Sequence, residues 1–121
     1  MTRNHMTRGD VSEEIKKIKI TEKGITKDSF DKLKILCAGL KSEKEVSLFQ
    51  KSTDETLNLR TMCCAKNAIS NLFEGNYLNA WYEITDMLDY KKDDEYLSCD
   101  EVAIMSMVVE LFVARLENER K

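Results

Sequence analysis

Hydrophobic residues recur at spacings of three and four along most of the chain, which is the period of an amphipathic α-helix. The clearest stretch begins at Asp28, and its apolar face consists of Phe30, Leu33, Leu36, Cys37 and Leu40. It predicts a helix that ends near Gly39 to Lys41. Similar spacings follow in residues 59–73, 77–90 and 102–116. The last stretch is apolar around most of its circumference, so we expect it to form the central helix.

Three Ser-x-x-Glu sequences predict where helices begin. They start at Ser42, Ser52 and Ser98. In such a capping box the serine hydroxyl accepts a hydrogen bond from the third helical amide, and the glutamate accepts one from the serine amide. The first box predicts a short helix through residues 46–49, the second a longer helix that stops at Gly75, and the third the terminal helix.

The spacing of hydrophobic residues in 59–73 predicts which face of this helix is buried. The face comprises Leu59, Met62, Ala65 or Lys66, Ile69, and Leu72 or Phe73.

The N-terminal region gives a weaker pattern. Residues 1–10 lack periodicity and predict a flexible tail, whereas residues 11–27 fit either a short helix or a β-hairpin turning at "EKG". The expected architecture is an all-α, compact orthogonal bundle of about five helices, with 11–121 as a single domain.

The stretch "LFEGNYLNAWYEI" marks a corner between two predicted helices. We expect Gly75 to end one helix in a left-handed conformation and Asn76 to cap the next. Residues 74–88 resemble the turn and second helix of a tetratricopeptide repeat, with Gly75, Tyr77 and Ala80 at matching positions. Because the chain has no second copy at the repeat's period, the resemblance implies a tight helix-turn-helix corner.

Composition indicates a globular intracellular protein. Hydrophobic residues make up 42% of the chain and charged residues 34%, and no apolar run is long enough to cross a membrane. The first residues lack the apolar core of a secretion signal, so we expect a cytoplasmic location. The four cysteines, at positions 37, 63, 64 and 99, are expected to be reduced.

Little in the sequence indicates catalysis, a metal or a cofactor. The single histidine, His5, lies in the predicted tail, where no fold could hold it beside a nucleophile. Cys63 and Cys64 are adjacent on a predicted helix and therefore point about 100° apart. We expect a non-enzymatic protein without bound metal or cofactor.

Charge is unevenly distributed along the chain. Residues 1–51 contain 12 Lys/Arg against 8 Asp/Glu, and residues 52–121 contain 7 against 14. Lys27, Lys34 and Lys41 are seven residues apart and so share one helix face, as a phosphate-binding track would require. Binding to nucleic acid, or a role in a nucleoprotein complex, is therefore the second hypothesis.

A protein partner is the leading hypothesis, because aromatic residues concentrate late in the chain. The candidates for contact are Phe73, Tyr77, Trp81, Tyr82 and Tyr90. Tyrosine, tryptophan and methionine are enriched at the centres of interfaces. Trp81 and Tyr82 cannot face the same way on one helix, so one should be core and the other exposed. We expect a small regulatory or adaptor protein that acts through protein contacts, self-association included.

Overall fold

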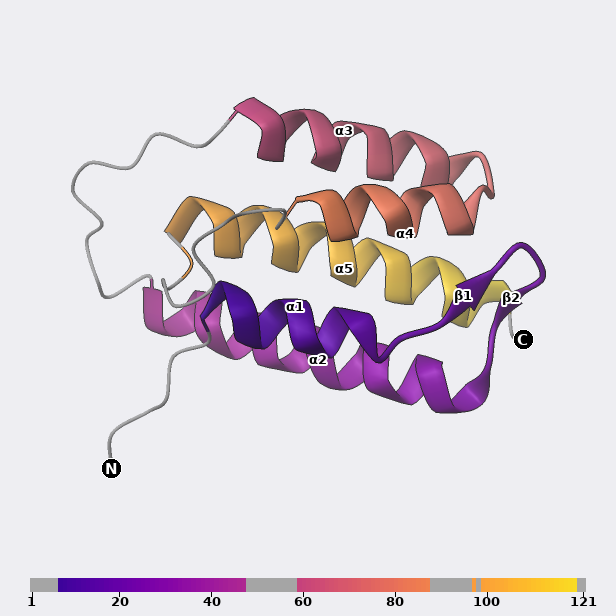
Figure 1. The fold of residues 1–121 in the computed structure, drawn as a ribbon, viewed down its shortest axis with the longest axis horizontal. Coiled ribbons are helices and arrows are strands. Elements are labelled where there is room, and N and C mark those ends of the chain that lie inside the picture. Colours follow the sequence, from indigo (N-terminus) through magenta and orange to yellow (C-terminus); the bar gives the residue numbers. More distant parts are fainter. Residues whose placement is uncertain (1–6, 48–58, 88–96, 98, 120–121) are drawn as a thin grey trace.

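The computed structural model describes residues 7–47, 59–87, 97 and 99–119 (Figure 1). These residues form α1 (Arg8–Lys16), β1 (Ile20–Thr21), β2 (Gly24–Ile25), α2 (Lys27–Ser47), α3 (Leu59–Phe73), α4 (Tyr77–Asp86) and α5 (Cys99–Glu119). The prediction of a compact all-α bundle with a short N-terminal element is confirmed. The helices run lengthwise beside one another in Figure 1 rather than crossing at large angles. In the described part of the chain, no helix is long and apolar enough to cross a membrane.

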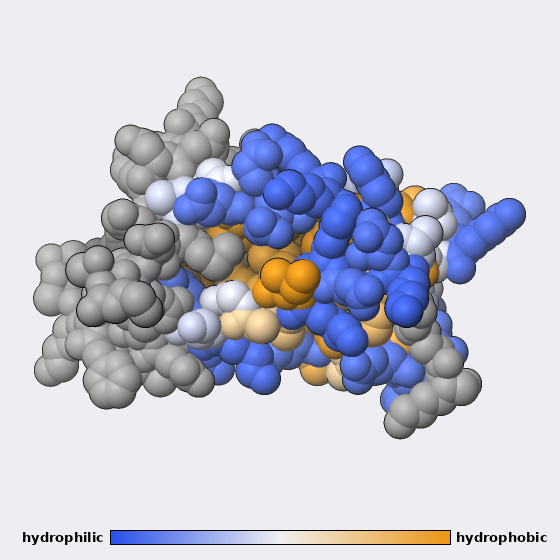
Figure 2. Space-filling model, turned by 90° about the horizontal axis from the view of Figure 1, so that it is seen from below, coloured by the Kyte–Doolittle hydropathy of each residue, from blue (hydrophilic) through white to orange (hydrophobic). Residues whose placement is uncertain are grey.

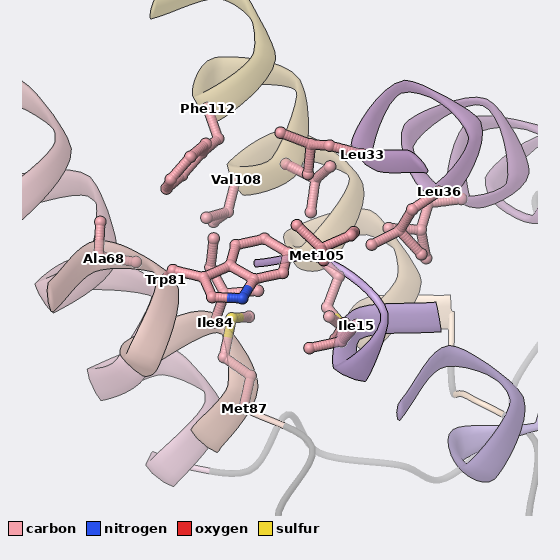
Figure 3. Packing of buried hydrophobic residues seen from close by; sticks show 14 of the residues in the cluster. Ile15, Leu33, Leu36, Ala68, Trp81, Ile84, Met87, Met105, Val108 and Phe112 are labelled. Carbon is pink, nitrogen blue, oxygen red and sulfur yellow. The ribbon is translucent and has the colours of Figure 1, made fainter. Parts of the chain in front are cut away.

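The last helix, α5, is the centre of the bundle, as its broad apolar pattern predicts. It contacts both α2 and α3, and it lies between them in Figure 1. Its buried hydrophobic residues are Val102, Met105, Val108, Val109, Phe112 and Leu116. In Figure 3 Met105, Val108 and Phe112 lie among side chains from other helices, including Leu33 and Trp81.

The N-terminal region contains both of the elements that the sequence left as alternatives. Helix α1 begins after Thr7, whose hydroxyl accepts from the amide of Asp10 (3.1 Å) while the Asp10 carboxylate accepts from the amide of Thr7 (3.0 Å). A hairpin follows in which Ile20 pairs with Ile25. Residues 7–10, which we placed in the tail, therefore belong to the fold. Residues 1–6 lie outside the described residues.

An ion pair between Arg8 and Glu101 joins the beginning of α1 to the beginning of α5. Both guanidinium contacts are hydrogen bonds, from Nη2 to Oε1 (2.5 Å) and from Nε to Oε2 (3.3 Å). The two side chains are only 12% and 7% exposed. Such a forked pair positions a short helix by geometry as well as by charge. Together with buried Val11 and Ile15 it attaches α1 to the bundle.

The prediction that a helix ends near Gly39 and another starts at Ser42 is wrong. Helix α2 continues through both positions to Ser47. Leu36, Leu40 and Glu43 are buried at consecutive helical spacings, and this continuous packing outweighs the weak helix preference of one glycine. The predicted helix through 46–49 is part of α2 as far as Ser47. Residues 48–58, with the box at Ser52, lie outside the described residues.

The corner between α3 and α4 has a Schellman geometry. Gly75 has a φ of 83°, its amide donates to the Leu72 carbonyl (3.1 Å), and the Asn76 amide donates to the Asn71 carbonyl (2.8 Å). The predicted role of Gly75 is confirmed. The predicted side-chain cap is not formed. The side-chain Nδ2 of Asn76 donates to the Glu74 carboxylate (3.3 Å).

Replacing Arg8 by Met should destabilise the protein by about 3 kcal/mol, because Glu101 stays buried and loses the guanidinium. The double variant Arg8→Met/Glu101→Leu should recover most of this loss, because two apolar side chains need no charge partner. Urea unfolding of the single and double variants measures both effects. An Arg8→Met variant as stable as the wild type would contradict the assigned role.

Replacing Gly75 by Ala should destabilise the protein by about 1–2 kcal/mol, because residues with a Cβ disfavour the left-handed conformation. No atom lies within 4 Å of the added Cβ, so the loss is conformational rather than steric. Gly75→Asn should lose less, since asparagine tolerates this conformation. Thermal unfolding of both variants tests the order; equal losses would argue against a conformational cause.

Candidate protein-binding face

Trp81, a predicted contact residue, is part of the core. Its side chain is 4% exposed, and its ring meets the Phe112 ring edge-on, with centroids 5.6 Å apart. Figure 3 shows it pointing inward from α4. The expectation that only one of Trp81 and Tyr82 faces inward is met, since Tyr82 is 57% exposed.

Tyr77 is half-buried at the edge of the same cluster. Its ring also contacts Phe112 edge-on, at 6.1 Å. Burial, followed by the nearby Glu119 carboxylate, raises the pKa of the Tyr77 hydroxyl. Because its hydroxyl is neutral and its ring is largely covered, Tyr77 contributes mainly to the core and less to an exposed contact surface. Tyr90 lies outside the described residues.

Phe73, at the end of α3, is a predicted contact residue that lies beside Arg115 of α5. It is 59% exposed. The Arg115 guanidinium lies over its ring, 5.5 Å from the centroid, and donates to the Phe73 carbonyl (3.4 Å). This contact places the outer side of α3 next to one side of α5.

The apolar pattern of α3 is turned relative to the predicted one. The residues it buries are mostly small, namely Thr61, Cys64, Ala65, Ala68 and Leu72. Met62 is 51% exposed and Ile69 only partly buried. Small side chains let α3 pack close to its neighbours. Its larger apolar side chains lie in a second row at spacings of seven and four, in which Met62 and Phe73 are exposed and Ile69, between them, packs partly against the core.

A similar row runs along α5. Met107 is 41% exposed, and Ile104 and Leu111 are partly buried. These three residues share one side of the helix, and Arg115 follows one turn later on that side. Because Arg115 lies over the Phe73 ring, the two rows are adjacent at their C-terminal ends. We call them together the α3–α5 face, which comprises Met62, Ile69, Phe73, Ile104, Met107 and Leu111.

The remaining exposed hydrophobic side chains are separate from this face. Within the described residues, the other large ones are Ile35 on α2 and Tyr82 on α4. Figure 2 views the molecule from below, the side on which α2 lies in Figure 1, and hydrophobic atoms there form small groups among hydrophilic ones. Isolated hydrophobic residues are normal on protein surfaces, but a contiguous row is not.

The predicted lysine track lies on one side of α2, and two of its members interact within the protein. Lys27, Lys34 and Lys41 are all exposed. The Lys34 ammonium lies 5.2 Å from the Phe30 ring centroid, and Lys41 pairs with Glu110 at 3.3 Å. The neighbouring carboxylate lowers the positive charge that this side of α2 can offer to phosphate.

The cysteines do not form an evident reactive centre in the described part of the chain. Burial, followed by Glu83, raises the pKa of the Cys64 thiol, and burial, followed by Glu110, raises that of Cys37. Both thiols are therefore protonated at neutral pH. Among the described residues no three His, Cys, Asp or Glu side chains are grouped as metal ligands.

A polar hollow of about 210 Å³ lies where the hairpin turn meets the α3–α4 corner. It is lined by Glu22, Gly75, Asn76, Tyr77, Leu78 and Asn79. The Glu22 carboxylate disfavours an anion at the start of α4, which is otherwise the ligand that a helix N-terminus attracts.

Comparison of the chain with protein-family models, with curated proteins and with solved structures finds no match.

Trp81→Ala should destabilise the protein by about 3–5 kcal/mol, because it leaves a cavity beside Phe112. Tyr82→Ala on the same helix should change stability by no more than about 0.5 kcal/mol, because its ring is mostly in solvent. Denaturant unfolding of the two variants measures the difference. Similar losses from both would contradict the assignment of Trp81 to the core and Tyr82 to the surface.

Proposed function

We propose that this chain is a small cytoplasmic adaptor or regulatory protein, without catalytic activity, that binds another protein through the α3–α5 face. The observation that carries the proposal is the orientation of α3. This helix buries small residues such as Ala65 and Ala68 and leaves Met62 and Phe73 exposed. An isolated bundle gains nothing from exposing its larger apolar side chains, whereas a bundle with a partner does.

The residue types of the face favour protein contacts. Methionine and aromatic residues are enriched at the centres of interfaces, and flexible methionines adapt to a partner's shape. Met62, Met107 and Phe73 are the most exposed members of the face. The proposed cytoplasmic location agrees with the expectation that the cysteines of such a chain are reduced.

Binding to nucleic acid through α2 is the second candidate. The alignment of Lys27, Lys34 and Lys41 favours it, while the pairing of Lys41 with Glu110 weakens it. Binding of this kind would be electrostatic and would weaken steeply with added salt.

The immobilised wild-type chain should capture partner proteins from the native host. The double variant Met62→Glu/Met107→Glu should lose this capture, because it places two charges in the contact surface. The control is Ile35→Glu, which places the same charge at an exposed apolar residue outside the face. Quantitative mass spectrometry of the captured proteins, with circular dichroism to establish folding, gives the readout. Equal capture by the wild type, the double variant and the control would refute the α3–α5 face as the binding surface.

Titration with RNA and DNA at two salt concentrations distinguishes the nucleic-acid alternative from the leading proposal. Salt-sensitive binding that is lost in Lys27→Glu/Lys34→Glu and kept in the Met62/Met107 variant would replace the leading proposal.

A further inference from the structure

We infer that residues 7–25, which comprise α1 and the hairpin, open from the bundle as one unit while α2, α3, α4 and α5 stay folded. We call these residues the N-terminal arm. Its opening pivots at Thr26 and uncovers apolar side chains of α2, α4 and α5, so the arm is an internal cover with a closed and an open position. The inference concerns a different part of the molecule from the α3–α5 face and does not depend on the proposed function.

No element of the N-terminal arm is stable without the bundle. Helix α1 has nine residues, fewer than an isolated helix needs in water, and it buries only Val11 and Ile15. Each strand of the hairpin has two residues, and a lone two-stranded hairpin is marginal at best. The arm is therefore ordered only while it lies on the bundle. Its helix and its hairpin are expected to open together.

A row of aliphatic side chains packs the arm against the bundle. Figure 1 shows α1 lying along α2, and β1 contacts α4. In Figure 3 Ile15 lies between Leu36 of α2 and Ile84 of α4. The buried members of the row are Val11, Ile15, Ile18 and Ile20. Because the row continues from α1 through the connecting residues into the hairpin, one part of the arm cannot leave without weakening the rest.

A polar contact holds the arm near each end. Arg8 pairs with Glu101 at the start, and the Lys19 amide donates to the buried Ser29 hydroxyl (2.9 Å) near the hairpin. A buried ion pair gives little net stabilisation, because the loss of hydration offsets the attraction. Opening returns water to both charges, so the pair fixes the position of the arm without opposing its release strongly.

The other four helices hold together without the arm. Helix α5 contacts α2 and α3, and α3 contacts α4, so these contacts form a continuous series. The edge-on contact of Trp81 with Phe112 joins α4 to α5 within the same series. Loss of the arm removes one cover from α5 and leaves the others in place. The bundle is therefore expected to stay folded when the arm opens.

Thr26 connects the arm to α2 and caps α2 by itself. Its hydroxyl accepts a hydrogen bond from the Ser29 amide (3.2 Å), and its carbonyl accepts one from the Phe30 amide (2.9 Å). The first turn of α2 therefore keeps its cap when the arm leaves. Rotation of the backbone between Ile25 and Thr26 can move the arm without unwinding α2.

Native-state hydrogen exchange of the full chain, followed by NMR, tests the inference. The Val11 amide reports α1, the Lys19 amide reports the hairpin end of the arm, and the Val109 amide reports α5. We expect the two arm amides to share one protection factor, at least about 100-fold below that of Val109. Their exchange should also rise together with added urea, because one opening exposes the surface of the whole arm.

Two variants separate the arm from the bundle. Ala68→Gly weakens α3 whether the arm is open or closed, so it should lower the protection of Val109 by about tenfold and leave that of the arm amides unchanged. Arg8→Met should lower the protection of the arm amides by at least about tenfold, because Glu101 regains water only when the arm opens. Adding Glu101→Leu to Arg8→Met should restore most of that protection.

Two results would overturn the inference. Equal protection of Val11, Lys19 and Val109, lowered together by Ala68→Gly, would show that the arm leaves only when the whole chain unfolds. Different protection factors for Val11 and Lys19 would show that α1 and the hairpin open separately. Neither result concerns capture of proteins through Met62 and Met107, so the proposed function is tested independently.

Discussion

The packing of α5 against α2 on one side and α3 on the other is the contact on which the rest of the structure depends. A helix with apolar residues around most of its circumference is stable in water only when other helices cover it. Phe112 illustrates the consequence, because the rings of Tyr77 and Trp81 both meet it edge-on. The third cover is α1, attached at the start of α5 through Arg8 and Glu101.

Helices α5 and α3 both leave large apolar side chains exposed, Met107 on α5 and Met62 and Phe73 on α3. A helix that buries Ala65 and Ala68 approaches its neighbours closely. Its larger side chains Met62 and Phe73 stay outside that contact and are mostly exposed, with Phe73 beside Arg115 of α5. The same close packing that completes the core therefore creates the α3–α5 face.

Most of the fold could be predicted from the sequence, because the hydrophobic period of a helix and the conformational freedom of glycine are local signals. Gly75 is an example: its left-handed turn follows from the missing Cβ. The capping box at Ser42 wrongly predicted a helix start, because a capping signal is local and weak. Burial of Leu40 and Glu43 keeps α2 continuous through this position. The two-residue strands of the hairpin were too short to be distinguished from a helix by pattern.

The exposed apolar residues of α3 were harder to predict, for a physical reason. Hydrophobic spacing identifies a stripe on a helix but not which edge of a wide stripe faces the core. On α3 the choice depends on side-chain volume, and the spacing pattern assigned Met62 to the core and missed Ala68. The signal in the sequence was that the apolar stripes of α3 and α5 are wider than a single buried face requires. Aromatic clustering was a poorer guide, since Trp81 and Tyr77 pack on Phe112.

The division between core and face also separates stability from the proposed binding. Residues that hold the bundle together, such as Trp81 and Arg8, are buried, so altering them changes the free energy of unfolding and any activity together. Met62, Phe73 and Met107 have much of their surface in solvent already. A polar residue there removes apolar surface that the folded chain leaves exposed, so folding loses little and a partner loses much. A protein that binds through such a surface can vary its partner while keeping its core.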